Sequence, residues 1–71
     1  MKVYVRAPYP QKKLDELKQW FDEVVYEPWT TTGERYYEDE MLENLKRVQP
    51  DALITELDRV TEKVLNGYDK L

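Results

Sequence analysis

The sequence predicts a single small α/β domain built on a parallel β-sheet. Short apolar runs that suit strands alternate with amphipathic segments that suit helices, and parallel strands are usually joined by such helical crossovers. The chain has 71 residues, which is enough for one domain with a thin core. A chain of this size buries only about 60% of the surface that its unfolded form exposes.

The first strand and the first helix are predicted within residues 3–21. The apolar run at residues 3–5 combines valine and tyrosine, which pack well on a pleated surface. Pro10 suits the first turn of a helix, because the missing N–H of proline has no partner there. The helix predicted from Pro10 to about Trp20 presents an apolar face of Leu14, Leu17 and Phe21.

The second strand is predicted at residues 24–26, ending before Pro28. Residues 29–33 indicate a loop, in which Thr31 and Glu34 have the spacing of a capping box. The second helix is predicted from roughly Glu38 to Val48, with acidic residues leading and basic residues trailing, as the helix dipole favours. Its apolar face consists of Met41, Leu42, Leu45 and Val48.

The third strand is predicted at residues 52–55, which are almost entirely apolar, as expected of a strand covered on both faces. A last helix is predicted from about Thr61 to Asn66, with Thr61 as its N-cap and Gly67 as a left-handed C-terminal cap. The element order is therefore β-α-β-α-β-α. A strand order of 2-1-3 would place the first two helices on opposite faces, which is half of a flavodoxin-like three-layer fold.

Composition excludes several classes of site. The chain has no cysteine and no histidine, so it offers no thiolate nucleophile, no histidine base and no metal site made of these residues. Its two glycines cannot form a glycine-rich phosphate loop. A net charge of -4 argues against nucleic-acid partners, which need a basic face. No apolar run approaches the roughly 18 residues of a membrane span, and without a signal or cysteines we expect a cytoplasmic protein with no membrane partner.

Several groups of polar residues have an ordinary structural interpretation. The acids around Glu38–Glu40 suit a solvated helix N-terminus better than a metal site, because consecutive helical residues diverge. The loop and boundary aromatics suit packing at the edge of a core, since no basic groove surrounds them. The hydroxyls of residues 30–32 suit local bonds to the backbone. These aromatics are Tyr9, Tyr26, Trp29, Tyr36 and Tyr37.

The turn after the third strand, residues 55–58, is the most informative position. In open α/β sheets, ligands bind beyond the carboxyl ends of the strands. Glu56 and Asp58 could hold a ligand there or perturb each other's pKa. Alternatively, Asp58 caps the turn or helix and Glu56 faces water. Arg6, directly after the first strand, is expected on the same edge of the sheet.

The order of several segments and the residues within them resemble those of a known family. The segments are an N-terminal strand like Lys2-Val3-Tyr4-Val5 followed by Ala7-Pro8, the stretch Pro28-Trp29-Thr30-Thr31-Thr32-Gly33, and Asp51-Ala52-Leu53-Ile54 followed by a polar turn and Val60-Thr61-x-x-Val64. Together they extend over almost the whole chain. The sequence resembles the start of the D-isomer-specific 2-hydroxyacid dehydrogenases, in the group that includes phosphoglycerate dehydrogenase. Glu56 departs from the basic or small polar residue that the family more often has in this turn.

The resemblance implies that residues 1–71 are the N-terminal segment of a substrate-binding domain, with the NAD-binding domain absent from this chain. The parent enzyme would interconvert a 2-hydroxy acid and a 2-oxo acid with NAD. Its catalytic arginine, histidine and glutamate would come from other segments, so this chain would hold no catalytic residue, bind no cofactor or metal, and be inactive alone. The resemblance places Thr55, Glu56 and Leu57 at the substrate.

Two other interpretations stay open from the residues alone. The chain could be a stand-alone acidic α/β module that binds a partner protein, or an excised or designed minimal α/β unit. If the chain is instead the dehydrogenase segment, it stops where family members continue into a further strand, and the third strand would lie at an uncovered apolar edge of the sheet. Such edges pair readily with other chains, so we expect self-association through this edge.

Overall fold

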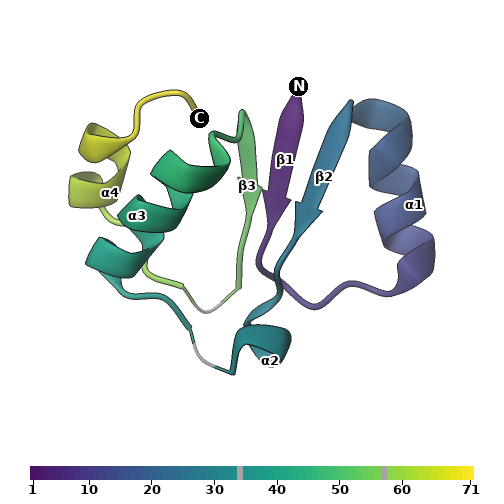
Figure 1. Cartoon of the computed structure of the whole chain (residues 1–71), viewed down its shortest axis with the longest axis horizontal. Helices are drawn as coiled ribbons and strands as arrows, with labels where there is room; N and C mark the ends of the chain where they lie inside the picture. Colours follow the sequence, from purple (N-terminus) through teal and green to yellow (C-terminus); the bar gives the residue numbers. More distant parts are fainter. Residues whose placement is uncertain (34, 57) are drawn as a thin grey trace.

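The computed structural model describes residues 1–33, 35–56 and 58–71, and Figure 1 shows the path of the chain. The described residues form a three-stranded sheet with helices on both sides. The elements in chain order are β1 (Lys2–Val5), α1 (Gln11–Trp20), β2 (Glu23–Tyr26), α2 (Trp29–Thr32), α3 (Glu38–Val48), β3 (Ala52–Ile54) and α4 (Glu62–Gly67).

The three strands are parallel and lie in the order β2-β1-β3, which confirms the predicted fold class and strand order. Tyr4 at the centre of β1 lies opposite Val25 of β2 and Leu53 of β3. Because all three strands run the same way, their carboxyl ends meet at one edge of the sheet. Any ligand site of the kind predicted for open α/β sheets must form at that edge.

The larger part of the core lies between the sheet and the helices α3 and α4. Tyr4 is completely buried there, together with Met41, Leu45, Val48, Val64 and Tyr68. Figure 1 shows α3 and α4 on one side of the sheet and α1 on the other. Side chains alternate along a strand, so Val3 and Val5 point toward the α1 side, where Leu14 is the buried residue of α1.

Helix α3 begins and ends where the sequence predicts. Glu38, Asp39 and Glu40 occupy its first turn and Lys46 and Arg47 its last, so the charges complement the helix dipole at both ends. The helix ends at Gln49, which adopts a left-handed backbone with φ 59°. Three of the four predicted apolar residues are buried and Leu42 is half-buried.

The loop predicted at residues 29–33 was wrong in one respect, because residues 29–32 form the one-turn helix α2. Pro28 precedes it with φ -66°, and Gly33 ends it with φ 88°, a left-handed conformation that glycine adopts at little cost. The capping box predicted for Thr31 was also wrong, since Thr31 lies inside α2. Its predicted partner Glu34 lies outside the described residues.

The left-handed cap predicted for Gly67 was wrong, because Gly67 is the last residue of α4 and has no positive φ. A Cβ atom at this position would lie 2.7 Å from Cδ2 of Leu42. The glycine therefore lets α4 approach α3 closely. Thr61 is the N-cap of α4 as predicted, but its hydroxyl donates to Glu38 of α3 at 2.5 Å instead of capping its own helix.

Candidate functional site

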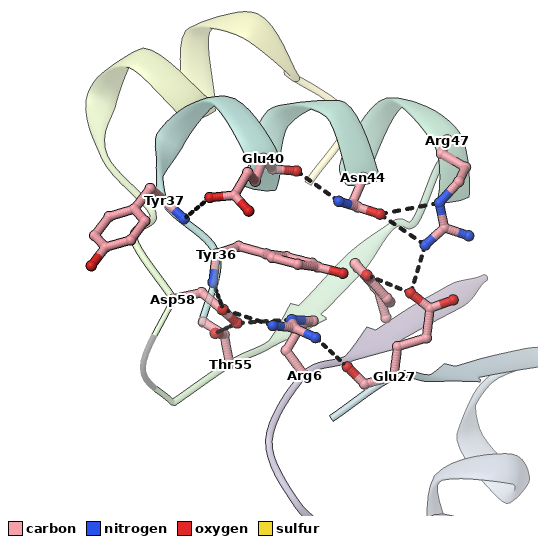
Figure 2. Close-up of polar contacts among 10 residues, drawn as sticks. Arg6, Glu27, Tyr36, Tyr37, Glu40, Asn44, Arg47, Thr55 and Asp58 are labelled. Atoms are coloured by element: carbon pink, nitrogen blue, oxygen red, sulfur yellow. Dashed lines mark hydrogen bonds and ion pairs between the residues drawn. The ribbon is translucent and has the colours of Figure 1, made fainter. Parts of the chain in front are cut away.

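The carboxyl ends of the three strands gather a cluster of polar side chains. We call Arg6, Glu27, Tyr36, Thr55 and Asp58 the carboxyl-end cluster. Arg6 follows β1, Glu27 follows β2, and Thr55 follows β3, so the parallel sheet brings them to one edge. Figure 2 shows these side chains converging beneath α3, with Tyr36 arriving from the segment before that helix.

The centre of the cluster is the guanidinium of Arg6, whose side chain is completely buried. Its Nε donates to Oδ2 of Asp58 and its Nη2 to Oδ1, both at 3.1 Å, which is the two-pronged geometry that arginine offers a carboxylate. Its Nη1 donates to the backbone carbonyl of Glu27 at 2.6 Å. The guanidinium carbon lies 3.6 Å from the centre of the Tyr36 ring, close enough for a cation–π contact.

The backbone of Arg6 is held as firmly as its side chain. Its N–H donates to the carbonyl of Ile54 in β3 at 2.7 Å, and its carbonyl accepts from the N–H of Trp29 in α2 at 2.9 Å. These two bonds fix the residue between β3 and the segment that follows β2. The direction of the Arg6 side chain is therefore set by the sheet itself.

Asp58 collects donors from three segments. Besides Arg6, it accepts from the hydroxyl of Thr55 at 2.6 Å and from the backbone N–H of Tyr36 at 2.6 Å. Burial by itself raises the pKa of the Asp58 carboxyl, but the hydrogen bonds from Arg6, Thr55 and Tyr36 outweigh it and lower the pKa below the usual value. Asp58 is therefore a charged, fully bonded acceptor at neutral pH.

Glu27 forms the other end of the cluster. It accepts from the hydroxyl of Tyr4 at 2.8 Å and from Arg47 of α3 at 2.5 Å. Burial raises the pKa of Glu27, but the hydrogen bonds from Arg47 and Tyr4 lower it by a larger amount. The pKa of Glu27 therefore lies below its usual value. Burial and the bond to Glu27 raise the pKa of the Tyr4 hydroxyl, which stays protonated.

The three residues that the sequence places at the substrate have different surroundings. Thr55 is half-buried, and its hydroxyl hydrogen is used in the bond to Asp58. Glu56 is exposed to solvent. Leu57 lies outside the described residues. Of the two interpretations of Glu56 and Asp58, the contacts favour the one in which Asp58 binds groups of the turn and Glu56 faces water, and substrate contact at this turn stays a prediction.

Sequence reasoning did not predict how Arg6 and Tyr36 build the cluster with Asp58. Arg6 was expected on this edge, but its burial and its pairing with Asp58 were not. A charged residue directly after a buried strand was the available signal, since arginine is almost never fully buried unless it is paired. Tyr36 had no comparable signal, because nothing local indicates that its ring covers a guanidinium.

The described residues show no ready-made ligand pocket. Across residues 1–33, 35–56 and 58–71 no cavity is found, and no group of three or more acidic side chains is placed to hold a metal ion. None of the helices in this part of the chain has the length and apolar character to cross a bilayer.

The turn from β1 into α1, where a dinucleotide phosphate would bind in a glycine-rich fold, does not fit NAD. It contains no glycine, and its residues Pro8 and Pro10 have no N–H to donate.

Comparison with known proteins supports one family. No family model and no solved structure matches the chain. Over all 71 of its residues the chain is 41% identical to a protein of Bacillus subtilis (strain 168) named "Putative 2-hydroxyacid dehydrogenase YoaD". The chain spans 21% of the length of that relative. The chain is thus similar in sequence to part of a protein that is named as a 2-hydroxyacid dehydrogenase.

Proposed function

We propose that this chain is the N-terminal part of the substrate-binding domain of an NAD-dependent oxidoreductase that interconverts a 2-hydroxy acid and a 2-oxo acid. The observation that carries the proposal is the 41% identity along all 71 residues to a protein named as a 2-hydroxyacid dehydrogenase. The parallel sheet of order β2-β1-β3 is compatible with it. Membership of the phosphoglycerate dehydrogenase-like group and a cytoplasmic location are finer parts of the same proposal.

The chain's own residues fit a scaffold that holds one side of a substrate. NAD bound by another domain would accept the hydride that leaves C2 of the hydroxy acid. The carboxyl-end cluster offers no base for the accompanying proton, because Asp58 is paired with Arg6 and Glu27 with Arg47. The half-buried Thr55 and the exposed Glu56 of the turn are left to contact substrate.

The direct test is an assay of the complete protein that carries this segment. We expect it to reduce NAD when supplied with D-2-hydroxy acids, followed by the absorbance of NADH, and to run in reverse with 2-oxo acids. Residues 1–71 alone should show no turnover. A complete protein that is folded and inactive with every 2-hydroxy acid and both nicotinamide cofactors would contradict the proposal.

Variants of the complete protein test the role of the turn. Thr55→Val removes the hydroxyl and keeps the shape of the side chain, so we expect a higher KM for the hydroxy acid. The matched control is Thr30→Val in α2, where the threonine is exposed and the same atoms are changed. Equal KM values for the two variants would remove Thr55 from the substrate site.

The reading frame offers a test that needs no protein. If the coding sequence continues past Leu71 into a strand and a G-x-G-x-x-G segment, the dehydrogenase proposal gains a dinucleotide site. A natural stop codon at this point would instead favour a stand-alone interaction module.

We also propose that residues 1–71 alone self-associate through β3. This strand is an edge of the sheet among the described residues, and its three residues are all half-buried. An apolar edge with unpaired backbone groups pairs readily with another chain. Sedimentation at micromolar concentrations should show a mass that rises with concentration, whereas a monomer at every concentration would contradict this.

A further inference from the structure

Arg6 lies at a position where a substrate-binding arginine would be expected. It follows the central strand at the carboxyl end of the sheet, and a guanidinium is the group that best matches a carboxylate. Its nitrogens, however, are engaged within the protein. Nε and Nη2 bind Asp58, Nη1 binds the carbonyl of Glu27, and Tyr36 covers one face. The side chain has no exposed surface.

We propose that Arg6 is a positioning residue, which acts through Asp58 to hold the turn at residues 55–58 in the geometry that contacts substrate. This inference rests on the proposed function, since it assigns a role in the same site. It goes further because it names the Arg6–Asp58 ion pair as the contact that shapes the turn. It also excludes Arg6 as the group that binds the substrate carboxylate.

The contacts of Asp58 show how this ion pair acts. One carboxylate joins the turn after β3 to the end of β1 through Arg6, and to the segment before α3 through the N–H of Tyr36. A backbone bond from Arg59 N–H to the carbonyl of Tyr36, at 2.9 Å, closes the same two segments together. The Asp58 end of the turn is thereby fixed relative to β1 and to the segment before α3.

Thr55 is the residue on which this fixation acts most directly. Its hydroxyl hydrogen points to Oδ2 of Asp58 at 2.6 Å, so its oxygen is left as an acceptor. The bond selects one side-chain conformation, and a group held in one conformation before substrate arrives loses less entropy on binding. If Asp58 moved, Thr55 would be free to rotate and to donate elsewhere.

Stability alone does not require an ion pair at this position. Burying two charges costs several kcal/mol per ion before their attraction is counted, and well-packed apolar residues of similar volume are often as stable. Directional hydrogen bonds are what the apolar replacement cannot supply. This difference makes it possible to separate positioning from stability by experiment.

The decisive variant is the double substitution Arg6→Met/Asp58→Leu in the complete protein, which removes both charges and keeps the volume. We expect it to melt cooperatively while its KM for the 2-hydroxy acid rises about 10- to 100-fold, because small displacements of binding groups have effects of that size. The kcat should change less than about 3-fold, since no group near the reacting atoms is altered. The matched control is Arg47→Met, an arginine of α3 that also binds Glu27 but does not touch the turn.

The second variant, Asp58→Asn, keeps the size of the side chain and decides the matter if the double variant does not fold. It should raise KM in the same direction by a smaller factor. Hydrogen exchange of the amides at residues 55–58 should also become faster, while exchange in α1 stays unchanged. Rescue by Asp58→Glu is not expected, because the longer side chain displaces the turn.

The outcomes separate the two proposals. A folded double variant, or a folded Asp58→Asn protein, with wild-type KM and unchanged exchange at the turn would overturn the positioning role. A double variant that loses kcat and leaves KM unchanged would also overturn it, because this pattern indicates a group that acts in the reaction itself. A wild-type complete protein that turns over no 2-hydroxy acid would overturn the proposed function, and faster exchange in Asp58→Asn would then still support the fixation of the turn.

Discussion

The two ends of the sheet each carry an ion pair, and the two pairs differ in almost everything except their chemistry. At the amino end, the terminal ammonium of Met1 lies 2.6 Å from Asp22, with the side chains 71% and 92% exposed. At the carboxyl end, Arg6 lies 3.1 Å from Asp58, and neither side chain is exposed. The shorter distance therefore belongs to the pair that water surrounds.

Burial determines how strongly the protein's stability depends on each ion pair. Around an exposed pair, water and salt screen the attraction, and two mobile groups must be held still, so little net stability results. Inside the protein the attraction is stronger, but each charge depends on its partner because no water replaces it. The amino-end pair can thus be lost with little effect, whereas the carboxyl-end pair must be kept whole or removed whole. Four expected outcomes test this contrast, from the largest to the smallest.

Arg6→Met alone leaves the Asp58 carboxylate buried without its cation. We expect a loss of about 3–5 kcal/mol in the free energy of unfolding, as found when one partner of a buried pair is removed. Urea unfolding followed by tryptophan fluorescence measures it. The control is Arg35→Met, an exposed arginine directly before Tyr36 in the chain. Equal effects of the two substitutions would show that burial does not govern this end of the molecule.

Acid should also destabilise the protein through the carboxyl-end pair. The pKa of Asp58 in the folded protein lies below its usual value, so its contribution is complete above the ordinary aspartate pKa of about 3.9 and disappears as pH falls through the folded-state pKa. Protonation weakens charge-assisted bonds worth roughly 1.5–3 kcal/mol. The pKa of Glu27 is also lowered in the folded protein, so its contribution to stability should be lost over the same direction of pH change.

The check on this prediction is the urea midpoint measured from neutral pH down to about pH 2. Asp58→Asn cannot be protonated in this range, so its midpoint should fall less steeply than that of the wild type. Parallel curves for the two proteins would assign the acid sensitivity to other carboxylates.

Tyr36→Leu removes the ring that lies 3.6 Å from the Arg6 guanidinium and keeps the backbone N–H that binds Asp58. We expect a loss of about 1–2 kcal/mol, between the values for an exposed and a desolvated cation–π contact, because Tyr36 is half-buried. The control is Tyr37→Leu, because Tyr37 is 51% exposed and its ring centre lies 5.3 Å from the guanidinium carbon of Arg35. A larger loss at Tyr37 would reverse our ranking of the two contacts.

Asp22→Asn tests the amino end and should give the smallest effect. Losing this carboxylate should cost little stability, because both partners are largely exposed and water can replace each contact. We expect an unchanged urea midpoint at physiological salt, and a small decrease at low salt, where screening is weaker. A decrease comparable with that of Arg6→Met would remove the contrast between the two ends.

The features that the sequence predicted depend on local contacts, and the features that it did not predict depend mostly on contacts between distant segments. The bounds of α3 were predicted correctly because its apolar spacing and its end charges lie within the helix itself. Helix α2 was missed because a single turn between Pro28 and Gly33 has the local signals of a loop. Gly67 was misread because its reason is the side chain of Leu42 in another helix.

The sequence by itself determined the alternation of strands and helices, the parallel sheet and the absence of cysteine, histidine and glycine-rich sites. These follow from composition and from patterns that span a few residues. The tertiary structure alone decided that Arg6 meets Asp58, which is 52 positions away in the chain. That meeting needs the pairing of β1 with β3 to bring two loop ends together. The attraction between the two charges is strong because the packed protein excludes water from both, and no short segment has this property.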